Sequence, residues 1–347
     1  MTDQTDASTQ EDQANAAQRR QKGEFVRGVS RFRNVIGDTP DFPAEPSRYH
    51  LHVALNCPWC HRVTLARGIL GLQTSISMDV AFPNRTDDTD PAGANFWHFT
   101  PDRISPLTGA PLPECTEETA SGSGYRLAKD LYAAEGSEER SVPILYDKKT
   151  KRIVSNESAE IVRMLGAHAN ALGSTLAPDL LLDMYPADDT AADLRRDIDE
   201  LNEFIYVNIN NGSYKAGFSS DQSVYDAAFA NYFSALATLE QRLADGRPFL
   251  TGDRFTEADL RLFPTLYRHD PVYYVRMKLN GGRILDYPHL WRWLCRVYGL
   301  DGVADSGSLI HCRQGYFGRS WNNVVPLGPV KPMTYPEAYR HPALARD

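Results

Sequence analysis

The stretch Leu51–Leu72, which reads LHVALNCPWCHRVTLARGILGL, constrains the fold more than any other part of the chain. A short apolar run is followed directly by the motif Cys57-Pro58-Trp59-Cys60, and apolar residues then recur at helical spacing. This order predicts a strand, a tight turn and a helix, with Cys57 at the start of the helix. Proline suits the first helical turn because the N–H group at that position has no intrahelical partner.

The position of Cys57 predicts a reactive thiol. A sulfur atom there faces unpaired backbone N–H groups and the positive end of the helix dipole, and both favour the thiolate. A C-x-x-C motif between a strand and a helix is typical of redox proteins. The alternatives are a buried structural pair and half of a zinc site, but Cys115 and His311-Cys312 lack the spacing of further zinc ligands. We therefore expect Cys57 to be the nucleophile, while Cys60 either resolves a mixed disulfide or packs as a small residue.

Length and composition narrow the class of protein. A chain of 347 residues can form two domains with full cores, and 42% hydrophobic and 24% charged residues are ordinary for a soluble protein. The net charge of −8 argues against a nucleic-acid partner. No apolar run approaches the roughly 20 residues of a membrane span, and five scattered cysteines do not suggest a secreted disulfide framework. These features predict a cytoplasmic enzyme without a membrane partner.

The first part of the chain is predicted to be thioredoxin-like. Residues 1–22 are polar and are expected to form a disordered tail, neither signal peptide nor anchor. The patterns that follow give strand, helix, strand, a turn-rich insert over 83–140, and then strand, strand, helix. This order predicts an α/β thioredoxin-like domain over residues 23–175. An insert of that length inside a compact domain is usually functional. The expected elements are a strand and helix over about 50–71 and strands over 75–81, 141–147 and 151–154.

The second part of the chain is predicted to be all-helical. From Ala191 the apolar residues recur at helical spacing, so an all-α domain is expected over residues 190–321, followed by a proline-rich extension over 322–347. Thr256 and Asp259 have the spacing of a capping box at a helix start. The predicted helices cover about 191–209, 224–244, 256–268, 271–278 and 289–298.

Three residues near the predicted sheet are candidates for binding a peptide-like ligand. Glu157 and Ser158 open a predicted helix, where N–H groups and the Ser158 hydroxyl could hold a carboxylate and Glu157 an ammonium group; simple N-capping is the alternative. Val142 precedes Pro143, which stands where thioredoxin-like folds keep a cis-proline. The backbone of Val142 could therefore pair with an extended ligand.

Four further residues are candidates for the same site. Trp97, in the insert, could pack on the ligand, and Arg140 could supply a cation, although a core tryptophan and a solvated arginine are the alternatives. The helical part is rich in tyrosine, which can form a pocket that is apolar in its body and polar at its tips. Tyr316 is one of these tyrosines, and Tyr214 lies in a stretch whose glycines and amides suit a loop or a helix break.

Taken together, separate stretches of the chain resemble the glutathionyl-hydroquinone reductases, the xi class of the glutathione transferases, which are omega-like. The resemblance covers roughly residues 25–330. The stretches that carry it are Cys57-Pro58-Trp59 with His61-Arg62, Val142-Pro143 with Asp147-Lys148-Lys149, Ser155-Asn156-Glu157-Ser158-Ala159-Glu160, Asn210 to Phe218, Phe255 to Asp259, and Val324-Val325-Pro326-Leu327-Gly328-Pro329.

The resemblance implies a homodimer with the glutathione transferase fold, using glutathione as cosubstrate and no metal. It implies that Cys57 attacks the sulfur of a glutathionyl-hydroquinone, that the quinol leaves, and that a second glutathione releases the mixed disulfide. Carried over by position, the glutathione-binding residues are Trp97, Val142, Glu157 and Ser158. Arg140 is the candidate for the cation, although it does not stand at the family's position. Tyr214 and Tyr316 line the quinol site, with Tyr273 a weaker candidate.

The chain departs from the family pattern at two positions. Cys60 stands where the family usually has alanine, so a glutaredoxin-like route through both cysteines is an alternative. Arg140 stands one residue closer to Val142 than the family's glutathione-binding arginine, with Glu139 in the usual place. Another low-molecular-weight thiol, such as mycothiol, is therefore an alternative cosubstrate. Besides the route through both cysteines and the other thiol cosubstrate, a third alternative function is that of a glutathione transferase that conjugates glutathione to its substrates.

Overall fold

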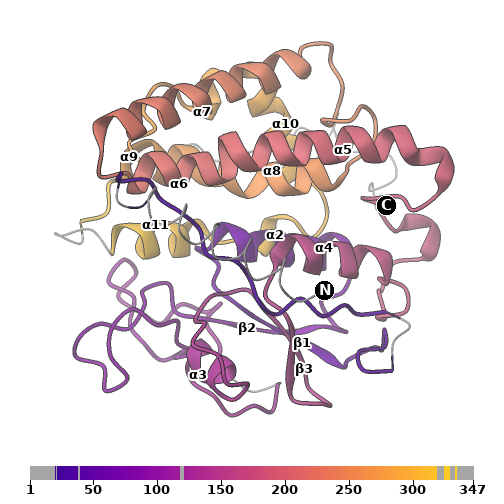
Figure 1. The fold of residues 1–347 in the computed structure, drawn as a ribbon, viewed down its shortest axis with the longest axis vertical. Helices are drawn as coiled ribbons and strands as arrows, with labels where there is room; N and C mark the ends of the chain where they lie inside the picture. The colour runs from indigo at the N-terminus through magenta and orange to yellow at the C-terminus, as the bar shows by residue number, and fades with distance from the viewer. Residues whose placement is uncertain are drawn as a thin grey trace, which may run out of the picture.

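The computed structural model describes residues 20, 22–37, 40–117, 121–318, 324–328 and 333. It has an α/β layer below and a helical layer above, and the two are packed against each other along their length (Figure 1). The predicted tail over 1–22 and the predicted extension over 322–347 lie mostly outside the described residues.

The lower layer contains a four-stranded sheet in the order β2-β1-β3-β4. β1 runs parallel to β2 and antiparallel to β3, and β3 runs antiparallel to β4, which confirms the predicted thioredoxin-like arrangement. β2 and β3 are shorter than the predicted strands over 75–81 and 141–147, and β4 is shifted by one residue from the predicted strand over 151–154. The strands are β1 (Tyr49–Val53), β2 (Ser77–Val80), β3 (Ile144–Asp147) and β4 (Arg152–Ser155).

Helices cover both faces of this sheet. α2 (Pro58–Ile69) and α4 (Ser158–Ala167) lie between the sheet and the helical layer, whereas α3 (Ala128–Ala133) lies on the opposite side with the long insert (Figure 1). All five residues of β1 are consequently buried. The core of the layer is therefore built around β1, which leads directly into the Cys57 turn.

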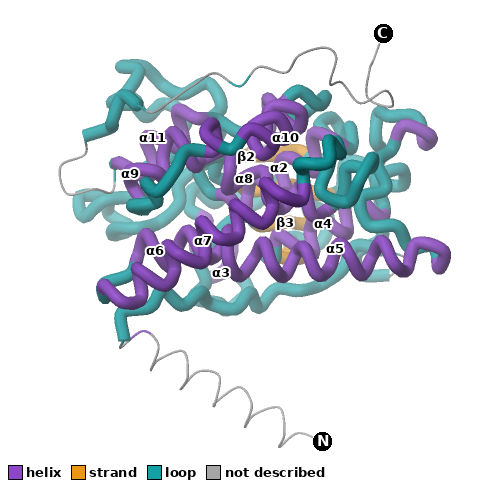
Figure 2. The backbone as a smooth tube through the Cα atoms, turned by 90° about the horizontal axis from the view of Figure 1, so that it is seen from above, coloured by secondary structure: helices purple, strands orange, loops and turns teal. Residues whose placement is uncertain are grey.

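The helical layer confirms the predicted all-α architecture, and its helices lie over the sheet when the molecule is seen from above (Figure 2). The predicted helix over 191–209 ends in a π-helical segment, Tyr206–Asn210. The helix break that the sequence suggested near Tyr214 therefore lies before this residue, and Tyr214 itself is in a helix. A second π-helical segment, His269–Tyr273, interrupts the predicted helix over 271–278. The helices are α5 (Ala192–Ile205), α6 (Asn211–Phe218), α7 (Gln222–Arg242), α8 (Glu257–Arg268), α9 (Tyr274–Arg276), α10 (Pro288–Tyr298) and α11 (Leu309–Phe317).

Helix α11 is not predicted from the sequence. Its buried positions include His311, Cys312, Gln314 and Gly315, so it has no apolar stripe at helical spacing. Glycine at 315 allows a close approach, because a Cβ atom there would lie 2.0 Å from Nδ2 of Asn56, the residue before Cys57. This contact brings the C-terminal helix directly onto the cysteine turn.

The two layers are joined by contacts between α2 and α8. The backbone of α2 also comes very close to the backbone of the helical layer at one point. A Cβ atom on Gly68 would lie 2.2 Å from the carbonyl oxygen of Gly302. None of the helices within the described ranges combines the length and the apolar character of a membrane span.

Candidate active site

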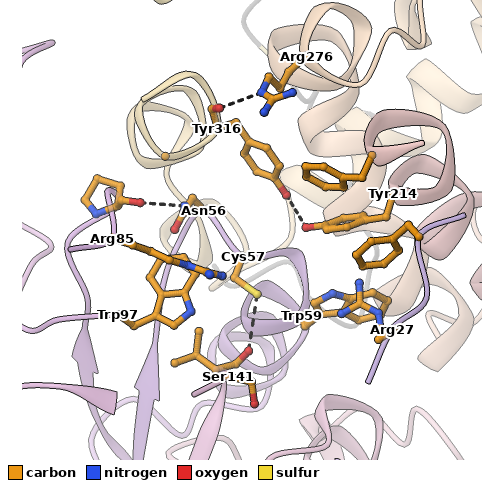
Figure 3. Close-up of a pocket in the computed structure, with 15 residues that line it drawn as sticks. Arg27, Asn56, Cys57, Trp59, Arg85, Trp97, Ser141, Tyr214, Arg276 and Tyr316 are labelled. Carbon is orange, nitrogen blue, oxygen red and sulfur yellow. Dashed lines mark hydrogen bonds between the residues drawn. The ribbon is translucent and has the colours of Figure 1, made fainter. Parts of the chain in front are cut away.

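Cys57 is the N-cap residue of α2, and Pro58 occupies the first turn, as the sequence predicts. The Sγ atom of Cys57 lies 3.7 Å from the carbonyl oxygen of Val142, which accepts a hydrogen bond from the protonated thiol. The Val142–Pro143 peptide bond is cis. Cys57 is half-buried and faces a cavity of about 520 Å³ (Figure 3).

The surroundings of Cys57 favour its ionised form. Burial opposes ionisation, but hydrogen bonds from the Cys60 thiol and from the N–H groups of Cys60 and Trp59, together with the charge of Arg268, lower the pKa of Cys57 to about 6. Burial raises the pKa of Cys60 well above its usual range, and the neighbouring Cys57 raises it further. The pair therefore consists of one acidic thiol and one protonated thiol that donates to it.

Arg268, at the end of α8, is a cation that contacts this turn directly. Its guanidinium group is fully buried and donates to the carbonyl oxygens of Leu55, at 2.7 Å, and of Cys57, at 3.3 Å. It also donates to Nδ1 of His61 at 2.7 Å, which holds that imidazole in one orientation. Burial and the Arg268 charge both lower the pKa of His61, so this histidine accepts as a neutral ring.

Two tyrosines close the cavity on the side of the helical layer. The hydroxyl groups of Tyr214, on α6, and Tyr316, on α11, lie 2.6 Å apart and point toward the cavity (Figure 3). Tyr273 hydrogen-bonds to Tyr316 at 3.1 Å but is fully buried and does not line the cavity. Burial raises the pKa of all three hydroxyl groups, so each one stays protonated near neutral pH.

A groove of about 890 Å³ adjoins the cavity and shares Val142 with it. Glu157 and Ser158 line the groove at the start of α4, and Arg140 lines it from the end of the insert. Glu157 is also the N-cap of α4, since its side chain accepts from the N–H group of Ala159 at 3.1 Å. The second carboxylate oxygen accepts a hydrogen bond from the Ser30 hydroxyl at 3.1 Å. Capping and ligand binding are compatible, because each carboxylate oxygen can accept more than one hydrogen bond.

All eight residues proposed from the sequence thus line the cavity or the groove. Trp97 lines the cavity, where the guanidinium group of Arg85 stacks on its ring at 4.4 Å. The sequence patterns did not indicate Arg85 or Arg27, although Arg27 stacks on Trp59 at 4.1 Å and lines both cavity and groove. Both arginines lie in irregular segments, where no periodic pattern marks a position as part of a site.

One further group of side chains has the donors to hold a metal ion. His50, His52 and Asp79 are buried in the sheet, with one donor atom from each lying within 4.8 Å of the others. Nε2 of His50 and a carboxylate oxygen of Asp79 are 3.1 Å apart and pair with each other. These residues do not line the cavity or the groove. The expectation that the protein uses no metal stays a prediction.

Family models match both layers of the structure. Residues 56–168 match the N-terminal domain of the glutathione S-transferases, and residues 222–296 match their C-terminal domain. The first match begins at Asn56, directly before the reactive cysteine, and ends just after α4. The second spans α7 to α10.

Individual relatives match over almost the whole chain. The glutathionyl-hydroquinone reductase YqjG of Escherichia coli is 39% identical, with 89% of this chain and 88% of that protein covered. The glutathionyl-hydroquinone reductase PcpF of Sphingobium chlorophenolicum is 37% identical, with 90% and 91% covered.

Solved structures show the same relationship. The glutathione-bound structure of YqjG has a TM-score of 0.75 at 36% identity and covers 93% of this chain and 100% of that one. The xi glutathione S-transferase of Phanerochaete chrysosporium has a TM-score of 0.79 at 36% identity, with 91% and 96% covered. The chain belongs to the glutathionyl-hydroquinone reductases, the xi class of the glutathione S-transferase family.

Proposed function

We propose that this protein reduces glutathionyl-hydroquinones to hydroquinones through a mixed disulfide on Cys57. The observation that carries the proposal is the acidic thiol of Cys57, placed between a groove suited to a peptide-like thiol and a pair of tyrosine hydroxyls. A thiolate is the form of cysteine that attacks sulfur. Two relatives that match almost the whole chain carry the name of this activity.

The reaction balances in two steps. The Cys57 thiolate attacks the thioether sulfur of the substrate, the bond between that sulfur and the aryl carbon breaks, and the carbon takes a proton as the hydroquinone leaves. Glutathione then remains on Cys57 as a mixed disulfide. The thiolate of a second glutathione attacks this disulfide, forms oxidised glutathione and returns Cys57 as a thiolate. The overall reaction uses one glutathione as the reductant.

The groove residues are proposed to hold the glutathionyl part. Glu157 pairs with the ligand's ammonium group, and Ser158 and the N–H groups at the start of α4 bind its neighbouring carboxylate. The backbone of Val142 pairs with the extended peptide. Trp97 packs on the ligand, and Arg140, which is exposed at the rim, binds the other carboxylate.

Tyr214 and Tyr316 are proposed to act on the quinol. Their hydroxyl groups stay protonated near neutral pH, so they can donate to a quinol oxygen and pass a proton toward the leaving group. Tyr273 holds the Tyr316 hydroxyl from behind. This arrangement supplies the proton that the aryl carbon needs in the first step.

The test is to incubate the protein with a glutathionyl-hydroquinone and excess glutathione and to follow free hydroquinone by chromatography. Protein-dependent release is expected, and Cys57→Ala is expected to abolish it. Cys115→Ala is the matched control, since Cys115 is buried and lines neither the cavity nor the groove. Substantial release by the Cys57 variant would refute the mechanism.

A dithiol route is the second candidate, and the contact between Cys57 and Cys60 is the observation that favours it. Under that route Cys60→Ala would stop turnover and leave glutathione trapped on Cys57, which mass spectrometry would detect. Under the proposed route, Cys60→Ala retains turnover at neutral pH but raises the pKa of Cys57, because it removes a hydrogen bond to the thiolate. Replacing glutathione with mycothiol in the same assay tests the alternative cosubstrate.

A homodimer in the cytoplasm completes the proposal. The dimer rests on the family resemblance, and the cytoplasm rests on the few, scattered cysteines, which suit a reducing compartment. Sedimentation equilibrium would test the assembly, and a mass equal to one chain of 38.9 kDa would exclude the dimer.

A further inference from the structure

The cavity in front of Cys57 is positively charged although the chain as a whole is acidic. The chain has 45 acidic and 37 basic residues. Yet Arg27, Arg85 and Arg276 line the cavity, and no acidic residue of the described ranges does. The adjoining groove, by contrast, contains Glu139 and Glu157.

The three arginines approach the cavity from different sides. With the sulfur of Cys57 near the centre of the view, Arg85 lies to the left, Arg27 to the right and Arg276 at the top (Figure 3). Arg27 and Arg85 line the groove as well as the cavity, so their charges are also available to the glutathionyl part of a substrate. Arg276 lines the cavity and not the groove, beside Tyr316 and Phe218. Its charge therefore faces the part of the cavity that is proposed to hold the quinol.

The contacts of Arg276 hold it in place without neutralising it. Its Nε atom donates to the backbone carbonyl of Tyr316 at 3.1 Å, and its guanidinium carbon lies 5.8 Å from the centre of the Phe218 ring. Among the described residues it forms no ion pair, and its two terminal nitrogens have no hydrogen-bond partner. The adjacent charge is Lys278, whose pKa is lowered by burial and then by Arg276. Lys278 therefore supplies no counter-charge to Arg276.

We infer that the cavity selects hydroquinones that carry an acidic ring substituent, and that Arg276 binds this substituent through its free terminal nitrogens. A carboxylate accepts two parallel hydrogen bonds from a guanidinium group. The charge of Arg276, which forms no ion pair among the described residues, favours an anion, and the low dielectric of a half-enclosed cavity strengthens that preference. The inference rests on the proposed function, since it names the class of quinol that the same site accepts.

A purely structural role for Arg276 makes a different prediction. Its bond to the Tyr316 carbonyl satisfies one acceptor at the end of α11, and this would explain its presence without any ligand. Losing that bond alone would disturb Tyr316 and slow every quinol alike. If Arg276 selects the substrate, its loss changes the ratio of kcat/KM for acidic substrates to that for neutral substrates. A general loss of activity leaves this ratio constant.

The test uses two glutathionyl-hydroquinones of almost equal size, one with a carboxymethyl group on the ring and one with the corresponding neutral carboxamide. The readout is the ratio of kcat/KM for the acid to that for the amide. A ratio of about ten or more is expected for the natural protein, given the usual strength of hydrogen bonds between charged groups. Arg276→Gln is expected to bring the ratio close to one, Arg276→Lys to an intermediate value, and Arg276→Glu below one.

Lys278→Gln is the matched control, because it removes an exposed positive charge two residues away that lines neither the cavity nor the groove. The ratio is expected to stay as in the natural protein. A ratio near one in the natural protein, with both conjugates turned over, would overturn the inference and leave the proposed function standing. An equal fall in both kcat/KM values for Arg276→Gln would assign Arg276 a structural role instead. Release from neither conjugate would refute the proposed function, and the inference would fall with it.

Discussion

The Cys57 thiol is acidic because several weak effects together exceed the cost of burial. The Cys60 thiol and two backbone N–H groups donate to the sulfur, and Arg268 adds a positive charge behind the turn. Helix starts commonly favour anions in this way. The half-buried position keeps the sulfur reachable from the cavity. One residue thus combines the two properties that a nucleophilic cysteine needs, ionisation and access.

The pH dependence of Cys57 reactivity follows from this pKa. Since the pKa is lowered to about 6, the thiolate is present above that pH and is lost as the pH falls through it. The rate of alkylation by iodoacetamide is therefore expected to rise through about pH 6 and to level off by neutral pH. An ordinary cysteine would instead reach half of its maximal rate near pH 8.5, roughly. A midpoint near that higher value would contradict the ionisation described here.

Tyr316 is the central member of the tyrosine cluster, because its hydroxyl group contacts those of both Tyr214 and Tyr273. Tyr316→Phe is expected to lower kcat for quinol release by about 10- to 100-fold, at the low end of the range for a lost proton donor because Tyr214 remains. Steady-state kinetics with one glutathionyl-hydroquinone measures this. Tyr298→Phe is a suitable control, since Tyr298 does not line the cavity. An unchanged kcat for Tyr316→Phe would remove it from the mechanism.

Helix α8, which ends at Arg268, is fixed at its start by the predicted capping box. The carboxylate of Asp259 accepts from the N–H group of Thr256 at 3.0 Å, and Phe255, which precedes the cap, is buried. The carboxylate also accepts from the N–H group of Leu250, at 2.9 Å, and from Nε1 of Trp293, at 2.8 Å. The start of this helix is therefore tied to α10 and to the preceding loop.

Removing this carboxylate should cost more than removing an ordinary helix cap. Asp259→Ala leaves three buried donors without an acceptor, so the free energy of unfolding is expected to fall by about 3 kcal/mol or more. Thr256→Ala loses only the cap side chain, at about 1 kcal/mol. Urea unfolding of both variants measures the difference. Equal losses would show that the bonds from Leu250 and Trp293 contribute little.

Arg268 connects the two layers of the molecule at the reactive residue. It belongs to the helical layer, yet it donates to carbonyl groups of the cysteine turn in the α/β layer. The position of the turn and the pKa of Cys57 thus both depend on packing between the layers. The Gly315–Asn56 contact adds α11 to the same junction.

Arg268→Met is expected to raise the pKa of Cys57, because it removes the buried positive charge, and to destabilise the fold, because it leaves several carbonyl groups without donors. Arg268→Lys keeps the charge and is expected to raise the pKa less. The midpoint of the alkylation profile against pH reports the electrostatic effect, and urea unfolding reports the structural one. A destabilised Arg268→Met variant whose alkylation midpoint is unchanged would show that Arg268 acts on structure alone.

Local patterns in the sequence were sufficient to predict the elements around Cys57. The strand, the turn with Pro58 and helix α2 depend on residues within a few positions of one another, and so does the capping box at Thr256. Such features are predictable because alternation, helical periodicity and capping act over one or two turns of chain. The eight residues proposed for the site line the cavity or the groove, but it was the family resemblance that assigned them to a glutathione and a quinol, and their roles stay predictions.

What only the tertiary structure decided is the chemical environment of that cysteine. Arg268 lies 211 positions from Cys57, and the Tyr214–Tyr316 hydrogen bond joins residues 102 positions apart. No local pattern marks Arg27, Arg85 or Arg276 as facing one cavity, and α11 lacks the apolar stripe that would have predicted it. Charge, hydrogen bonding and cavity shape depend on which distant segments meet. The sequence by itself therefore determined that Cys57 stands at the start of a helix, and packing between the two layers decided the acidity of its thiol and which side chains face it.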